Sequence, residues 1–446
     1  MAGKEKRWMK SKRLVSIIFA AASLGVLVPH PSEANTGMQN IAYGAKSAGR
    51  GGTSIAVGDD TTVMNTNPAA VSKIEGGRLD INLEMMFPLF SFENPDNDTR
   101  GKHPIYLIPS AGIAYHQDAS KWSFGIGMFN EGGTGTDYGL LRVNNDVLGP
   151  GIGTTYIEYF SQFSYMKVTP TIAYNLTDKI SIALSPHLGY SMMRMKMPFF
   201  EPSLNRFWAA DMDGDAASLS GKIGILYHLK NQYGFGIVYT APTDMNLKGD
   251  VTMTAPTGDI SGMPQQSVMK GDLEMNMGWP QSVKAGTFVR LKSLGGMLVA
   301  FDVEWLNWSH YYREIPVKMT RISMNGMPVA DREFKMKTDW RDQWVFKLGM
   351  EYPATDHLNL RMGYIYGKNP VPPEGALATM NPFVEHHLTG GLGYGLSTHF
   401  ELNLAAVYGL SEDVKVGDTH NISPDMRNSK TGMEFLSTSM MLSYKW

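Results

Sequence analysis

Residues 78–87 read Arg78-Leu79-Asp80-Ile81-Asn82-Leu83-Glu84-Met85-Met86-Phe87, so apolar and polar side chains alternate almost without interruption. Successive side chains of a β-strand point to opposite faces, and a period of two therefore predicts a strand with one apolar and one polar face. The same alternation recurs in residues 179–190, 357–366 and 399–408. The chain is thus expected to be built from two-sided strands.

Segments with this alternation predict fourteen strands. They cover residues 78–92, 104–116, 121–131, 156–175, 179–196, 216–229, 233–253, 270–292, 296–309, 340–353, 357–369, 385–397, 399–413 and 433–446. Turn-sized connections at 118–120, 176–178, 230–232, 292–295, 353–356 and 396–398 alternate with long polar ones at 93–103, 132–155, 197–215, 254–269, 310–339, 370–384 and 414–432. Short periplasmic turns and long extracellular loops are typical of bacterial outer-membrane barrels, so both barrel termini are predicted to be periplasmic.

The fold class predicted from these features is an all-β, 14-stranded antiparallel transmembrane barrel. After residue 34 no segment approaches the roughly 18 consecutive apolar residues of a transmembrane helix, and a closed barrel is the other structure that satisfies every backbone group in lipid. A soluble β-sandwich is the alternative, but it gives no reason for turn lengths to be sorted by end. The last strand places Met440, Leu442, Tyr444 and Trp446 on one face, an ending similar to the C-terminal signature of outer-membrane barrels.

The N-terminus is expected to be an export signal covering residues 1–34. Six basic residues within the first thirteen precede a weakly polar to apolar segment from Leu14 to Val28, and Ser32-Glu33-Ala34 places small residues before the predicted cleavage. An uncleaved anchor is the alternative, although about 15 residues are short for spanning the bilayer. Without residues 1–34 the chain has 34 basic and 40 acidic residues, which excludes a nucleic-acid-binding protein. Since there is no cysteine, no disulfide can form.

Residues 35–77 precede the first clean alternation and are rich in small residues, so they are expected to fold inside a polar lumen. The stretch Ala48-Gly49-Arg50-Gly51-Gly52-Thr53-Ser54-Ile55-Ala56-Val57-Gly58-Asp59-Asp60, followed by Asn67-Pro68-Ala69-Ala70, resembles the FadL family of outer-membrane transporters for long-chain fatty acids and other hydrophobic compounds. The resemblance implies a hatch over residues 35–77, with Asn67, Pro68 and Ala69 as its motif, inside a barrel of residues 78–446.

The resemblance also implies a transport path that needs no energy input. Ligand would be captured by extracellular loops, pass into the barrel and leave sideways at a kink in the third strand, where Gly125 and Gly127 are the expected kink residues. The family's usual Pro-x-Gly after this strand is replaced by Asn130-Glu131-Gly132-Gly133.

Candidate ligand-binding residues come from two features. One predicted loop contains four aromatic residues, Phe199, Phe200, Phe207 and Trp208. Their apolar surface is expected either to bind ligand or to form a small core within the loop. Lys347 and Arg361 are expected on the lumen-facing side of neighbouring strands, where an anion would separate them. That anion would be a ligand carboxylate, or an acid of the chain such as Asp59, Asp60 or Glu351.

No catalytic constellation is recognisable, and the chain is not expected to be an enzyme or to hold a cofactor. In Glu385-His386-His387 adjacent side chains of a strand would point apart, so no metal site is expected there. Most of the 31 methionines are expected to face lipid. The leading functional hypothesis is uptake of a long-chain fatty acid or other hydrophobic small molecule by a monomer surrounded by outer-membrane lipid. A porin and an outer-membrane lipid hydrolase are the alternatives.

Overall fold

The computed structural model describes residues 37–446 except residue 118 and segments 146–152, 203–204, 230–231, 256–266 and 381–383. The predicted signal peptide lies outside the described residues, as do parts of the connections predicted at 118–120, 132–155, 197–215, 230–232, 254–269 and 370–384. No helix among the described residues is long and apolar enough to span a membrane.

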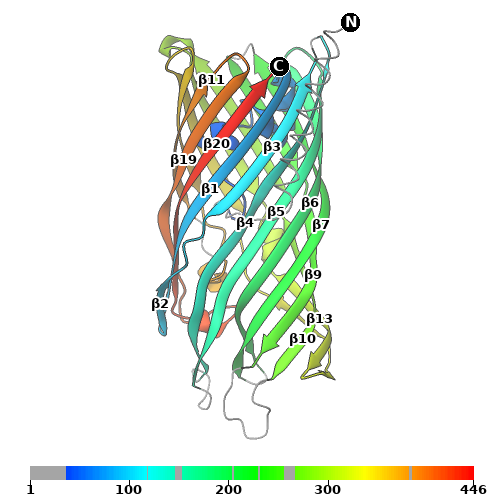
Figure 1. The fold of residues 1–446 in the computed structure, drawn as a ribbon, viewed down its shortest axis with the longest axis vertical. Helices are drawn as coiled ribbons and strands as arrows, with labels where there is room; N and C mark the ends of the chain where they lie inside the picture. Colours follow the sequence, from blue (N-terminus) through cyan, green and yellow to red (C-terminus); the bar gives the residue numbers. More distant parts are fainter. Residues whose placement is uncertain are drawn as a thin grey trace, which may run out of the picture. The chain divides into compact units, whose positions relative to one another are not determined.

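Fourteen antiparallel strands form the barrel wall, as predicted (Figure 1). Twelve of them are single strands: β1 (Gly76–Asn94), β3 (Tyr106–His116), β4 (Trp122–Asn144), β5 (Thr154–Asn175), β6 (Ile180–Glu201), β7 (Arg206–Leu229), β12 (Met297–Leu306), β16 (Gln343–Pro353), β17 (Leu358–Gly367), β18 (His386–Gly395), β19 (Phe400–Lys415) and β20 (Lys430–Lys445). The first and last strands close the barrel, because β1 pairs with β20 from Arg78↔Lys445 to Glu93↔Lys430.

The other two predicted strands are each interrupted at a proline. Residues 233–253 form β8 (Tyr233–Thr240) and β9 (Thr243–Thr254), separated at Pro242, and residues 270–292 form β10 (Val268–Trp279) and β11 (Ser282–Leu291), separated at Pro280. Proline has no N–H to donate to a ladder, which accounts for the breaks. A short 3-10 turn, η4 (Lys292–Leu294), follows β11.

The two faces of the strands meet different surroundings. On β1 the Ile81 side chain is 46% exposed on the outer face, whereas Asp80 and Asn82 are buried on the inner face. Apolar residues therefore face lipid and polar residues face the lumen, as the alternation predicts.

The predicted loops at 132–155 and 197–215 are wrong over most of their length. There β4 continues to Asn144 and pairs with β5, while β6 and β7 pair out to Glu201↔Arg206. The alternation that predicts strands is lost in these extensions, since residues 132–136 are only Gly and Thr, and Phe199 and Phe200 are adjacent. Other predicted loops also contain short elements: β2 (Asn97–Arg100), α3 (Ser309–Tyr312), β13 (Ile315–Met324), β14 (Met327–Pro328), β15 (Arg332–Met336), η5 (Pro373–Gly375) and η6 (Pro424–Met426).

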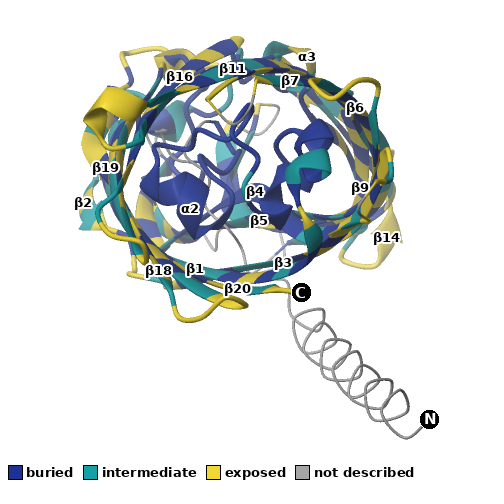
Figure 2. Ribbon diagram, turned by 90° about the horizontal axis from the view of Figure 1, so that it is seen from above, coloured by how far each residue is buried: buried dark blue, intermediate teal, exposed yellow. Residues whose placement is uncertain are grey.

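Residues 37–75, which we call the luminal segment, lie inside the ring of strands (Figure 2). The segment contains one short helix, α2 (Gly44–Gly49), and two 3-10 turns, η1 (Thr61–Met64) and η2 (Pro68–Lys73). Nearly all of its side chains are buried. The lumen is therefore filled across its width by the chain's own N-terminal residues.

Candidate functional site

Asn67, Pro68 and Ala69 hold one turn of the luminal segment against the wall. The Asn67 side chain caps η2 by accepting from the Ala69 N–H (3.1 Å), and its amide donates to the carbonyls of Ile55 (2.7 Å) and Ile225 of β7 (3.2 Å). Pro68 occupies the first position of η2, where its missing N–H costs nothing. One side chain thus joins two parts of the luminal segment to the barrel.

Buried carboxylates fix other parts of the luminal segment. Asp302 of β12 accepts from the backbone N–H groups of Ser54 (2.7 Å) and Ile55 (3.0 Å). Glu304, two residues along the same strand, accepts from the Gln39 amide (2.8 Å) and pairs with Lys284 of β11. Because buried donors are costly to leave unpaired, these contacts select one position for the segment.

Arg50 is a second centre of charge pairing, and the sequence analysis did not single it out. Its guanidinium contacts Asp59 (3.1 Å) of the luminal segment and Glu351 (2.9 Å) of β16. The signal was available in the Ala48-Gly49-Arg50-Gly51-Gly52 stretch, where an arginine stands among small residues. Gly51 has φ +61° and lies against the backbone of Leu348 and Gly363, so the small residues let the chain approach the wall closely.

The two predicted head-group residues already have partners. Lys347 donates to the Ile41 carbonyl (2.9 Å) and lies 3.6 Å from Glu304. Arg361 contacts Glu351 (2.7 Å) and the Asn403 side chain (2.8 Å), and it lies opposite Glu351 rather than Lys347 in the β16–β17 ladder. The two cations are therefore engaged by the chain itself, one of the alternatives left open by the sequence.

The irregularity of β4 is not at Gly125 and Gly127, which pair regularly with β3 and β5. The β4–β5 register shifts at two other places: between Asn130 and Gly132, where Glu131 is the extra residue, and between Asp137 and Gly139. A β-carbon at Gly125 would lie 2.6 Å from the Met64 sulfur, so that glycine makes room for the luminal segment. The first of the two register shifts lies at the residues that replace the family's Pro-x-Gly.

The wall is interrupted beside this bulge. The β3–β4 ladder ends at Ala111↔Met128, whereas β4 continues to Asn144 in pairing with β5. Residues 129–136 of β4 are all buried, which shows that this part of the strand has left the lipid-facing wall for the interior. Farther along β4, the Asp137 carbonyl accepts from the Lys102 N–H (2.7 Å) of the connection between β2 and β3.

The N-terminal end of the luminal segment occupies the edge of β4 that β3 has left. Gln39 forms an isolated antiparallel bridge with Gly132. The Gly133 N–H donates to the Met38 carbonyl (2.9 Å), and the Asn40 N–H donates to the Glu131 carbonyl (3.0 Å). Gly132 has φ +155°, and a β-carbon there would collide with the Met38 carbonyl. Residues 38–40 thus complete the ladder from inside the barrel.

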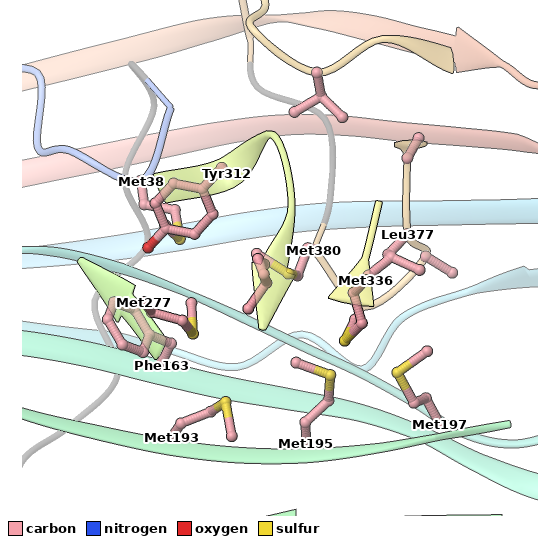
Figure 3. Close-up of a cluster of buried hydrophobic side chains, with 14 of the residues drawn as sticks. Met38, Phe163, Met193, Met195, Met197, Met277, Tyr312, Met336, Leu377 and Met380 are labelled. Atoms are coloured by element: carbon pink, nitrogen blue, oxygen red, sulfur yellow. The ribbon is translucent and has the colours of Figure 1, made fainter. Parts of the chain in front are cut away.

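Beside this bridge lies a small cavity that we call the thioether chamber. Its volume is about 10 Å³, and its lining includes five methionines and Phe163: Met38, Met193, Met195, Met277 and Met380. Figure 3 shows these side chains together: the methionines come from the luminal segment, β6, β10 and the β17–β18 connection, and Phe163 comes from β5. Thr134, on the inward part of β4, also lines the chamber.

The methionines are distributed differently from the prediction. Among the described residues 18 methionines are buried and four are strongly exposed, so the expectation that most face lipid is wrong. Met193, Met195 and Met197 alternate along the inner face of β6, a pattern that was visible in the sequence. Thioether side chains adapt to irregular apolar shapes, which suits a lumen that receives hydrophobic molecules.

The roof of the chamber is the connection between β17 and β18. Residues 376–380 are buried inside the barrel, and Met380 reaches the chamber. The Thr379 carbonyl accepts hydrogen bonds from Thr136 of β4 (3.0 Å) and from Ser161 of β5. The roof is therefore tied to the same two strands that carry the bulge.

The predicted aromatic loop is a strand extension that packs on itself and on its neighbours. Phe200 lies opposite Phe207, with ring centroids 5.3 Å apart, and Phe199 lies opposite Trp208 and 5.3 Å from Phe334. Phe207 and Trp208 are buried, whereas Phe199 and Phe200 are partly exposed. This surface combines a small core with accessible rings.

We expect the double replacement Phe200→Ser and Trp208→Ser to weaken capture of a hydrophobic ligand severalfold while the barrel keeps its resistance to heat. The variant loses the partly exposed ring of Phe200 and the buried ring of Trp208, but the interstrand hydrogen bonds of the wall remain. Equilibrium binding to purified protein measures the effect, with Val329→Ser on another hairpin as the control. Unchanged ligand affinity in the double variant would contradict a role in capture.

The chain matches the family described as outer membrane protein transport protein (OMPP1/FadL/TodX) over residues 26–442. No curated protein sequence matches it significantly. Among solved structures, the toluene transporter TodX of P. putida is 21% identical, with 91% of this chain and 99% of that chain covered and a TM-score of 0.74. The Ralstonia pickettii toluene transporter TbuX is 20% identical, with 91% and 99% covered and a TM-score of 0.68. A Pseudomonas aeruginosa FadL homologue is 12% identical, with 94% and 100% covered and a TM-score of 0.69.

These structures share the barrel fold of the chain, and the family match spans nearly all of its length. The family resemblance found in the N-terminal sequence is confirmed, as is the outer-membrane location. The chain belongs to the FadL/TodX family of outer-membrane transporters for hydrophobic compounds.

Proposed function

We propose that the protein takes up neutral hydrophobic compounds, which occupy the thioether chamber and then leave sideways between β3 and β4. The observation that carries this proposal is the position of Thr134. It lines the chamber and belongs to the part of β4 that has left the wall. A ligand in the chamber would therefore be next to the break in the wall, and the luminal segment would act as the hatch that closes it.

The chamber favours an uncharged ligand. Arg194 is the one charged residue among its described lining residues, and its guanidinium is half exposed and pairs with Asp211 (3.5 Å). A fatty-acid carboxylate would be buried there without a free cation, which is costly. The relatives named as toluene transporters support the same choice. A porin is disfavoured because the luminal segment fills the lumen.

The cavity is smaller than any hydrocarbon, so the methionine side chains must rotate to admit a ligand. Rotation is inexpensive for an unbranched thioether with three rotatable bonds. Sideways release then moves the ligand from one apolar environment to another, and each buried CH₂ is worth about 0.8 kcal/mol in either.

A polar substitution in the chamber tests the proposal. Met195→Gln places an amide without partners among apolar side chains, and burying such a group costs about 1–3 kcal/mol. We expect toluene affinity, measured calorimetrically on purified protein, to fall by about tenfold, since each factor of ten is about 1.4 kcal/mol. Met327→Gln, at a side chain that is 69% exposed, is the control. Equal toluene affinity in the two variants would contradict the chamber as the ligand site.

A second prediction concerns the head group. We expect the double variant Lys347→Met and Arg361→Met to change the affinities for a fatty acid and for its methyl ester by the same factor, because both cations are bound within the chain. The luminal segment should stay in place, because two ion pairs remain in the variant. Glu351 still pairs with Arg50, and Glu304 still pairs with Lys284. A selective loss of acid binding would show that these residues hold a ligand carboxylate.

A further inference from the structure

The five methionines of the thioether chamber form a cluster of neutral sulfur donors, and few other polar groups line the chamber. Met38, Met193, Met195, Met277 and Met380 are each at most 5% exposed. No carboxylate, imidazole or thiolate lines the chamber among the described residues, and the polar groups of its wall are Thr134, Ser161, Gln162 and Arg194. Hard cations, which need oxygen ligands, have no set of ligands there.

Thioethers are soft, polarizable ligands that select monovalent soft metals such as Cu(I). The cavity of about 10 Å³ is close to the smallest that holds one water molecule. It is therefore large enough for a single bare ion but too small for a hydrated one. From the number of thioethers, their burial and this volume, we propose that the thioether chamber binds one soft monovalent metal ion, Cu(I) or its analogue Ag(I), whether or not a transported ligand also enters it.

The four segments that supply the sulfur atoms give this site a structural consequence. Met193 and Met195 come from β6, Met277 from β10, Met380 from the roof, and Met38 from the luminal segment. The Met38 carbonyl is already bound to β4 through the Gly133 N–H. An ion held by Met38 and the wall methionines would tie the luminal segment to β6 and β10 and keep the bridge at Gly132 closed.

The cross-strand neighbours continue the sulfur-rich surface. Met195 lies opposite Met212 in the β6–β7 ladder, and Met277 lies opposite Met245 in the β9–β10 ladder. The chamber is thus the enclosed part of a larger thioether wall. An adaptable apolar lining accounts for methionines in general, but a binding experiment distinguishes that role from coordination.

The test is titration of the purified full-length protein in detergent with Ag(I) in chloride-free buffer, which avoids any redox step. We expect one equivalent of Ag(I) bound tightly, with X-ray absorption showing sulfur as its sole neighbour. Combined Met193→Leu, Met195→Leu and Met277→Leu should weaken binding by at least about 100-fold, since even a residue that only supports a metal ligand costs about 10- to 100-fold when mutated. Leucine conserves volume, and retained heat-modifiability on gels shows that the variant is folded.

The matched control replaces three methionines with similar burial that do not line the chamber, Met86, Met433 and Met441, with leucine. It should bind Ag(I) as the parent does. Equal loss in both triple variants, oxygen or nitrogen in the first shell, or Zn(II) bound as tightly as Ag(I) would overturn the proposal. If the chamber triple does not fold, the single Met277→Leu variant is titrated instead, and an unchanged affinity there would also overturn it.

Discussion

Deleting residues 35–70 is expected to turn an electrically silent protein into an ion-conducting channel. The barrel wall does not depend on these residues, because β1 closes on β20 and every neighbouring pair of wall strands forms its own ladder. The deletion removes α2, η1 and the first half of η2, which lie in the lumen. A barrel with a polar interior and no plug contains a column of water.

Buried charges would not prevent the truncated barrel from folding. Asp302, Glu304 and Lys347 contact the luminal segment in the intact protein. In the truncated barrel water would replace those partners, so the charged side chains would be hydrated rather than buried without a partner. Planar-bilayer recordings measure the result, and heat-modifiability confirms that the deleted protein is folded. A folded and inserted deletion protein as silent as the parent would refute the hatch.

Removing Glu131 alone is expected to abolish uptake and to leave the barrel intact. Glu131 is the extra residue between two regular stretches of the β4–β5 ladder, so its deletion makes Asn130↔Met166 and Gly132↔Tyr165 consecutive pairs. A bulge bends a strand and increases its twist, and without one β4 should follow the wall. The inward stretch and the break beside β3 would then be lost.

The matched control separates the shape of the strand from the charge of the residue. Glu131 pairs with Lys167 (2.7 Å), and both side chains are buried, so its deletion also leaves a buried lysine without its partner. Glu131→Gln removes the same charge but retains the bulge. We expect toluene uptake by cells to fall to the level of cells without the protein in the deletion, and to persist in Glu131→Gln. Equal uptake by the two variants would contradict release through the wall.

The barrel could be predicted from the sequence because the pattern that identifies each strand lies within that strand. Alternation in residues 78–87 assigns the lipid and lumen faces without reference to any other strand, and the turn lengths order the strands. The motif at Asn67-Pro68-Ala69 was recognisable for a similar reason, since a cap and a proline act over a few residues. Prediction was weaker where β4 and β6 continue past their alternating segments, because there the alternation is lost while the pairing continues.

The candidate site depends on contacts between residues far apart in the chain, and these were not predictable. Arg361 is paired because Glu351 and Asn403 lie next to it in the folded barrel. The bulge at Glu131 becomes visible only when β4 is aligned with β5. The thioether chamber brings Met38 and Met380 together across most of the sequence. The amino-acid sequence by itself therefore determined the strands and their faces, because local alternation is a property of neighbouring residues. Only the tertiary structure decided which luminal charges are neutralised, where the β3–β4 ladder ends and which methionines meet, because those outcomes depend on how the N-terminal segment packs against a closed ring.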